Sequence, residues 1–323
     1  MSSPRCCVRF RSTADRNVPM TSPGTRIADF IPPAVRARLK DLRLTSRRAV
    51  GLQGLGLHHS RSRGAGLEFA QYRAYEPGDE LRQIDWKLYA RSDRFFVREA
   101  ERESPLAAWL LIDASASMAQ EDKARPGWSR LSAAKGLAAC IAELALRQGD
   151  RFGLVALRDD GVRLLAPGAG LRQRDRFLLE LHGLEARGQW PSPEKLRPLW
   201  ERIGAGDLVV LLSDGFDEGS IEVMTRLAAA RREVLTVRIL TAEERDFPFS
   251  GGHRFHDPET DEELLGDGAA MRADFIARFT QARRELDARL DASGIRHAEY
   301  VLDQPLDLPL RRLFGARDAA EYA

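Results

Sequence analysis

Ala108-Trp-Leu-Leu-Ile112, an unbroken apolar run, leads directly into the polar loop Asp113-Ala-Ser115-Ala-Ser117. Such a run before a polar loop predicts a strand that is buried on both faces of a sheet. Beyond the loop, apolar residues recur at helical spacing over residues 131–147, and Gly149 supplies a stop signal. A buried strand, a polar loop and a helix in this order predict an α/β fold.

The same alternation continues from this unit to the C-terminus. Strands are predicted at residues 152–157, 162–165, 207–212, 234–240 and 295–301. Helices are predicted at residues 175–184, 194–203, 221–232, 271–292 and 308–314. Residues 162–165 are expected to pair antiparallel with residues 152–157. We therefore expect residues 105–323 to form a doubly wound, mainly parallel sheet with helices on both faces.

The sequence ahead of residue 105 has a different character. Residues 1–25 are predicted to be a disordered N-terminus, and residues 26–104 a basic helical arm followed by a small β-containing module. Within the module, the aromatic residues Tyr72, Tyr75, Trp86 and Tyr89 alternate with charged residues. The stretch Glu76-Pro-Gly-Asp79 is a turn signal.

The overall charge is nearly balanced, at +2 over 323 residues, and 43% of the residues are hydrophobic. This balance does not require a nucleic-acid or membrane partner, and no run of about 18 apolar residues predicts a membrane span. The basic residues of the arm are Arg36, Arg38, Lys40, Arg43, Arg47, Arg48, Arg61 and Arg63. They indicate either a solvated arm, which we favour, or a patch for an acidic surface such as nucleic acid.

The cysteine content indicates a reducing compartment. Cys6 and Cys7 are adjacent, and Cys140 falls in an apolar helical pattern, so the three do not form a disulfide framework. The N-terminus also lacks the apolar segment of a secretory signal. We therefore expect a cytoplasmic protein.

Oxygen-bearing side chains follow two of the predicted strands. Asp113, Ser115 and Ser117 follow the first, and Ser213 and Asp214 follow the strand at residues 207–212. Ligands of open α/β sheets bind at the carboxyl ends of the strands, and carboxylate and hydroxyl oxygens suit Mg²⁺. The alternative is that these residues only cap the following helices. The occurrence of two such strand ends favours a divalent metal site.

This layout resembles the von Willebrand factor A-type fold with its metal-ion-dependent adhesion site. Two stretches narrow this resemblance to one family. They are the block Arg73-Ala-Tyr75-Glu-Pro-Gly-Asp79-Glu-Leu-Arg82-Gln-Ile-Asp85-Trp86 and the later stretch Glu244-Arg-Asp-Phe-Pro248. Together they are similar to the signature of the domain-of-unknown-function family numbered 58, over residues 63–317.

The resemblance implies a non-enzymatic, Mg²⁺-dependent protein-binding adaptor or chaperone partner of a MoxR-type AAA+ ATPase. Its task would be the maturation of an unknown client protein or metal insertion into that client. Carried over to this sequence, the metal ligands are Asp113, Ser115, Ser117 and Asp214. The adhesion site normally adds a threonine, but residues 188–192 contain none, so Ser192 or a water molecule takes that place. Thr241 also stands where the family often has an aspartate.

Other candidate sites carry weaker signals. The same strand-end ion could instead activate water, as in a metal-dependent hydrolase, but no general base is evident nearby. His253 and His256, with Asp257 and Glu259, are favoured as a solvated loop over a second metal site, and so is His58-His59. The charges Asp79, Arg82, Asp85 and Arg91 indicate either a partner surface or, as we favour, a structural network.

Overall fold

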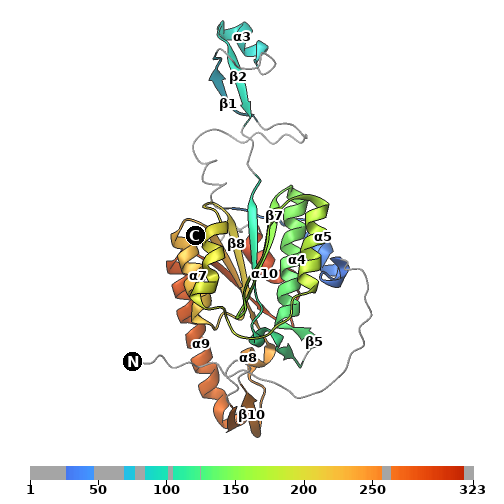
Figure 1. Cartoon of the computed structure of the whole chain (residues 1–323), viewed down its shortest axis with the longest axis vertical. Helices are drawn as coiled ribbons and strands as arrows, with labels where there is room; N and C mark the ends of the chain where they lie inside the picture. Colours follow the sequence, from blue (N-terminus) through green and yellow to red (C-terminus); the bar gives the residue numbers. More distant parts are fainter. Residues whose placement is uncertain are drawn as a thin grey trace, which may run out of the picture. The chain divides into compact units, whose positions relative to one another are not determined.

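The computed structural model describes residues 27–46, 69–76, 84–100, 105–123, 125–256 and 263–315 (Figure 1). The chain divides into two compact units. A small unit falls within residues 53–105, and a large unit comprises the residues before and after it. Each unit is described by itself.

A six-stranded sheet forms the centre of the large unit, in the order β12-β9-β8-β3-β6-β7. The strands are β3 (Ala107–Asp113), β6 (Arg151–Arg158), β7 (Gly161–Gly168), β8 (Leu208–Ser213), β9 (Glu233–Leu240) and β12 (Arg296–Val301). All neighbours are parallel except β6 and β7, which pair antiparallel as predicted. The predicted doubly wound α/β fold is confirmed.

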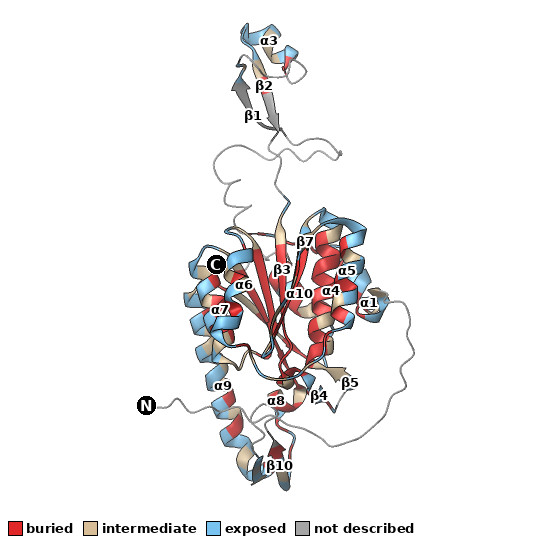
Figure 2. Ribbon diagram, in the orientation of Figure 1, coloured by how far each residue is buried: buried red, intermediate tan, exposed pale blue. Residues whose placement is uncertain are grey.

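Helices cover both faces of this sheet, because alternate residues of each strand point to opposite sides. The strands of the sheet are mostly buried (Figure 2). Leu110 and Ile112 of β3 pack into one apolar cluster, and Trp109 and Leu111 into another. The first cluster includes buried residues of α4 (Arg130–Gln148), α5 (Gly170–His182) and α10 (Asp307–Phe314). The second includes buried residues of α6 (Arg197–Arg202), α7 (Glu218–Ala229) and α9 (Gly268–Ala292).

The described part of the basic arm, residues 27–46, belongs to the large unit. It contains η1 (Ile27–Asp29) and α1 (Pro33–Arg38), and Leu39 is fully buried in the first cluster. The Arg36 guanidinium lies 2.8 Å from the Glu143 carboxylate, and Arg38 lies 2.9 Å from Asp307. The expectation that residues 26–104 form one segment is corrected here, because these contacts join the arm to α4 and α10. Arg47, Arg48, Arg61 and Arg63 lie outside the described residues.

In the small unit, β1 (Phe69–Ala74) pairs antiparallel with β2 (Phe96–Ala100). Between them, α3 (Trp86–Ser92) begins after Asp85, whose buried side chain accepts hydrogen bonds from the backbone N–H groups of Lys87 and Leu88. Asp85 is therefore a helix cap. Arg91 is exposed, and Asp79 and Arg82 lie outside the described residues.

Several short elements near the carboxyl edge of the large sheet were not predicted from the sequence. They are η3 (Ala116–Ala119), β4 (Glu121–Asp122), β5 (Arg125–Ser129), α8 (Ala242–Asp246), β10 (Gly252–His256) and β11 (Glu263–Asp267). A third apolar cluster supports this region, and its buried members are Leu240, Phe247, Phe249, Phe255, Phe275 and Phe279. Of the described helices, none is both long and apolar enough to cross a membrane.

The approach of β7 to β6 requires a glycine at residue 153. A Cβ atom there would lie 2.5 Å from the carbonyl oxygen of Leu165 and 2.8 Å from the backbone nitrogen of Pro167. We expect Gly153→Ala to lower the free energy of unfolding by about 1–3 kcal/mol, because backbone atoms must move. Urea denaturation measures this change. Gly252→Ala, where a Cβ meets nothing within 4 Å, is the control, and an equal loss in both variants would contradict the explanation.

Candidate functional site

The site lies at the carboxyl ends of β3 and β8, the two central strands of the sheet. The chain proceeds from β3 toward one edge of the sheet through β6 and β7, and from β8 toward the other edge through β9 and β12. Strand order therefore reverses between β3 and β8, and such a switch point opens the crevice in which α/β proteins bind ligands. The sheet itself thus places Asp113 beside Ser213 and Asp214.

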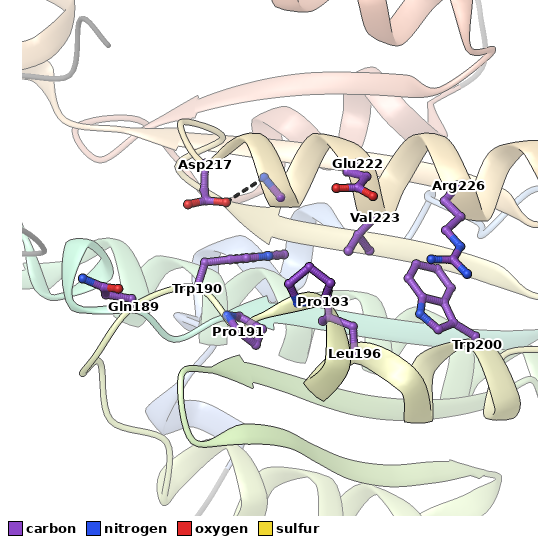
Figure 3. Close-up of a pocket in the computed structure, with 11 residues that line it drawn as sticks. Gln189, Trp190, Pro191, Pro193, Leu196, Trp200, Asp217, Glu222, Val223 and Arg226 are labelled. Atoms are coloured by element: carbon purple, nitrogen blue, oxygen red, sulfur yellow. Dashed lines mark hydrogen bonds between the residues drawn. The ribbon is translucent and has the colours of Figure 1, made fainter. Parts of the chain in front are cut away.

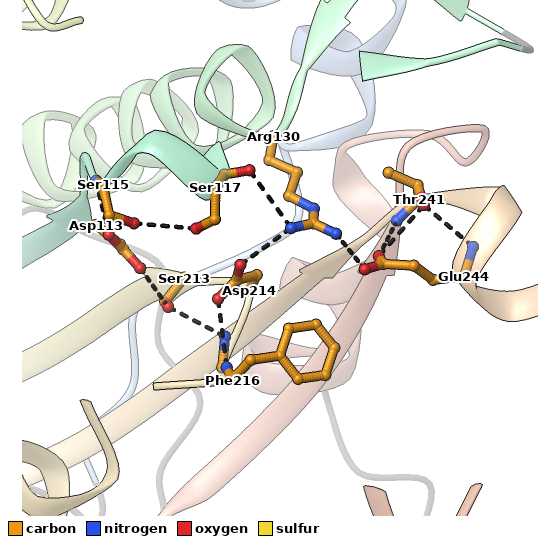
Figure 4. A network of polar contacts seen from close by, with 10 residues as sticks. Asp113, Ser115, Ser117, Arg130, Ser213, Asp214, Phe216, Thr241 and Glu244 are labelled. Carbon is orange, nitrogen blue, oxygen red and sulfur yellow. Dashed lines mark hydrogen bonds and ion pairs between the residues drawn. The ribbon is translucent and has the colours of Figure 1, made fainter. Parts of the chain in front are cut away.

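The polar groups at this point form a tight, buried network (Figure 4). The Ser213 hydroxyl donates to one carboxylate oxygen of Asp113 at 2.8 Å, and the Ser115 N–H donates to the other at 3.0 Å. The Ser115 and Ser117 hydroxyl oxygens lie 3.0 Å apart. These side chains and Asp214 are each no more than 2% exposed. The structure thus brings together Asp113, Ser115, Ser117 and Asp214.

Ser192 lies outside this buried cluster. The preceding segment does run along the site loop, since the Ala116 N–H donates to the carbonyl oxygen of Gly188 at 2.8 Å. Ser192 itself is exposed at the start of η4 (Pro193–Leu196), and its side chain hydrogen bonds with Glu194. Pro191 before it is buried, and Pro193 after it begins the short helix.

The electrostatics of the cluster fit a divalent cation. Burial, followed by the negative charge of Asp214, raises the pKa of Asp113 from 3.8 to about 7. The buried carboxylates of Asp113 and Asp214 repel each other, and a cation bound between their oxygens would remove that repulsion. The donor set of carboxylate and hydroxyl oxygens suits Mg²⁺ in particular.

Arg130 is the residue of this region that the sequence did not reveal. Its side chain is fully buried at the first turn of α4. One guanidinium nitrogen lies 3.0 Å from a carboxylate oxygen of Asp214, and another forms an ion pair with Glu244. An arginine that follows the helix cap Ser129 carries no local signal of burial, because its partners come from distant parts of the chain.

The histidine candidates find no further support. The His253 ring nitrogen lies 3.0 Å from the carbonyl oxygen of Ser250, and the ring packs against Phe249. Asp257, Glu259 and His58-His59 lie outside the described residues. Among the residues that are described, no group of three or more His, Cys, Asp or Glu side chains is placed to hold a metal. The candidate site therefore depends on two carboxylates supplemented by hydroxyls.

An open cavity of about 350 Å³ lies between α7 and the segment that follows Gly188 (Figure 3). Trp190, Pro191 and Trp200 line it on one side. On the other side, the Arg226 guanidinium stacks over the Trp200 ring at 4.3 Å. Asp217, which caps α7 three residues after Asp214, also lines the cavity. The cavity is therefore near the strand ends in the chain, but its lining includes none of the four buried site residues.

Comparisons with solved structures give low similarity scores. The SpRpn10 VWA domain aligns with a TM-score of 0.40 and 14% identity, over 66% of this chain and 98% of that one. The conserved hypothetical protein BatB from Bacteroides thetaiotaomicron aligns with a TM-score of 0.34 and 15% identity, over 58% of this chain and 98% of that one.

Sequence comparison gives a clearer result. An uncharacterized protein of Mycobacterium tuberculosis (strain ATCC 25618 / H37Rv) is 29% identical over 271 residues, which cover 81% of this chain and 82% of the relative. An uncharacterized protein of Mycobacterium bovis matches to the same extent. The model of the family described as protein of unknown function DUF58 matches residues 71–285, more than half of the chain. The chain therefore belongs to the DUF58 family.

Proposed function

We propose that this protein is a non-enzymatic adaptor that binds a partner protein through a divalent cation, Mg²⁺ in the first place, at the carboxyl ends of β3 and β8. One observation carries the proposal. Asp113 and Asp214 are buried together, with serine hydroxyls, at the switch point of the sheet. A buried pair of carboxylates costs stability unless something compensates their charge, which supports a binding role.

The ligand set also indicates what the ion would bind. Asp113, Ser115, Ser117 and Asp214 are too few to surround an octahedral Mg²⁺ ion with protein oxygens, which leaves positions for water. A carboxylate of a partner protein is the ligand that best replaces such a water, because it is anionic and hard. The expected partner surface therefore presents an exposed aspartate or glutamate.

The family resemblance suggests the identity of the partners. We propose a MoxR-type AAA+ ATPase, together with a client protein whose maturation or metal insertion the pair assists. The adaptor supplies the cation-dependent contact, and the ATPase supplies the work of remodelling. The protein acts in the cytoplasm in this scheme.

A pull-down with a MoxR-type ATPase encoded beside the gene tests this proposal. We expect the wild-type chain to retain the ATPase in Mg²⁺ and to lose most of it in EDTA. Asp113→Ala should retain as little ATPase in Mg²⁺ and in EDTA as the wild-type chain retains in EDTA. Asp291→Ala, which removes an exposed carboxylate near the end of α9, before the start of β12 and away from the site, is the matched control. Equal retention by wild type and Asp113→Ala, with and without Mg²⁺, would refute the cation-dependent contact.

The same experiment series separates the adaptor from a hydrolase. A cation held by Asp113 and Asp214 could also activate a bound water molecule. A screen of phosphate and carboxylic esters would then show turnover that disappears in Asp113→Ala. We expect no such turnover.

A further inference from the structure

Arg130 places a positive charge directly beside the proposed cation site. Its side chain is 0% exposed, and its guanidinium lies 3.0 Å from the Asp214 carboxylate and 3.4 Å from the backbone oxygen of Ser117. A buried cation in this place should weaken the binding of a second cation, because like charges repel strongly where water is excluded. The arrangement needs an explanation if the site is to hold Mg²⁺.

Glu244 removes this difficulty. Its carboxylate is 2% exposed and forms an ion pair with the other end of the Arg130 guanidinium. Arg130 and Glu244 therefore form a neutral pair, and the two negative charges of Asp113 and Asp214 remain to balance one divalent cation. The guanidinium can then hold Asp214 in place without lowering the negative charge of the site.

We propose that Glu244 is a charge-compensating residue of the cation site, which it controls through Arg130 without contacting the ion. This inference rests on the proposed cation site. It assigns a function to α8, an element that supplies no ligand. It also explains why a fully buried arginine and a metal site coexist within one hydrogen-bonded network.

The local geometry allows the charge of Glu244 to be removed alone. Glu244 is the third residue of α8 and forms a capping box with Thr241. The Thr241 N–H donates to the Glu244 carboxylate at 3.0 Å, and the Glu244 N–H donates to the Thr241 hydroxyl at 3.1 Å. Glutamine serves equally well in a capping box. Glu244→Gln therefore keeps the shape and the cap while it leaves Arg130 uncompensated.

Mn²⁺ binding, measured by the electron paramagnetic resonance of the free ion, tests the inference without any activity assay. We expect Glu244→Gln to weaken Mn²⁺ binding at least about 30-fold, because the ion then faces the full charge of Arg130. The double variant Arg130→Met/Glu244→Gln should bind Mn²⁺ at least about tenfold more tightly than Glu244→Gln, since the two positions together are again neutral. A merely structural role predicts the opposite, namely a double variant that binds no better than the single one.

Glu243→Gln is the matched control. Glu243 lies in the same turn of α8, is 6% exposed and forms its ion pair with Lys123 at 3.5 Å. Its replacement should change Mn²⁺ binding less than about threefold. If Glu244→Gln does not fold, Arg130→Met decides instead: it should bind Mn²⁺ more tightly than wild type, and equal or weaker binding counts against the inference.

The outcomes separate this inference from the proposed function. A wild-type chain that does not bind Mn²⁺ overturns both. A wild-type chain that binds Mn²⁺, with Glu244→Gln binding equally well, overturns only the charge compensation and leaves the cation site intact. Weakened binding in the single variant with recovery in the double variant supports both.

Discussion

Asp113→Asn is expected to make the metal-free protein more stable and to abolish its stabilisation by Mg²⁺. Asp113 is 1% exposed, and its pKa of about 7 reflects burial and repulsion by Asp214. Asparagine has the same shape, and its amide can still accept from the Ser115 N–H and donate to the Ser213 hydroxyl. The variant therefore loses the buried charge and keeps the hydrogen bonds.

The sign of the effect depends on pH. The folded protein binds the Asp113 proton more tightly than the unfolded chain does, so metal-free stability falls as pH rises from about 4 to about 7. At about pH 8 the whole cost is present, and Asp113→Asn should raise the free energy of unfolding by on the order of 1–3 kcal/mol. At about pH 5 the gain should be smaller, because wild-type Asp113 is then protonated in the folded state.

Thermal unfolding with Mg²⁺ and with EDTA measures both parts of this prediction. Wild type should melt at a higher temperature in Mg²⁺, by the mass-action effect of an ion that binds only the folded state. Asp113→Asn should melt at one temperature under both conditions. Asp217→Asn, which preserves the N-cap of α7 outside the buried cluster, should respond to Mg²⁺ as wild type does. A metal-free Asp113→Asn protein that is less stable than wild type would count against buried charge repulsion.

Phe247→Ala is expected to produce the largest loss of stability among single substitutions near the site, roughly 3–5 kcal/mol. The Phe247 ring is fully buried and packs against Phe275 at 4.4 Å and Phe249 at 5.1 Å between ring centroids. Its removal leaves a large cavity in the small third cluster, which has few other residues to collapse into the space.

Chemical denaturation together with hydrogen exchange can locate this loss. We expect faster exchange of the amides of α8, β10 and β11, which the third cluster supports, and little change in β3 or β6. Leu265→Ala, in β11, is the control, because Leu265 is 72% exposed, and its effect should stay within about 0.5 kcal/mol. Equal destabilisation by the two variants would contradict the role given to the cluster.

The centre of the sheet could be predicted from the sequence because its strands are nearly continuous apolar runs. Residues 208–212 are all apolar, and residues 234–240 are apolar apart from Thr236 and Arg238, since both faces of these strands are covered by helices. The strand ends could be predicted for the same reason: Asp113 and Asp214 are the first charged residues after two such runs. Local composition was sufficient wherever burial was two-sided.

The remainder depends on contacts between distant residues. The hairpin of β10 and β11 is rich in Gly, His and charged residues, and the packing of Phe255 against Phe247 and Phe249 joins it to the folded unit. Arg130 and Asp214 are 84 residues apart, and no local pattern indicates that they meet. Ser192 was a candidate because of its place in the sequence, whereas the structure places it exposed at the start of η4.

The contacts of the basic arm determine the order in which the large unit can be completed during synthesis. Leu39 of the arm shares one core with Leu310 and Leu313 of α10, and Arg38 pairs with Asp307. Arg38 and Asp307 are separated by 269 positions, so α10 must leave the ribosome before the arm can complete its contacts. The arm can contact α4 earlier, through Arg36 and Glu143, but the core that it shares with α10 stays open while most of the sheet emerges. Such long-range closure slows folding, and it makes the last strand and helix the step that completes the core.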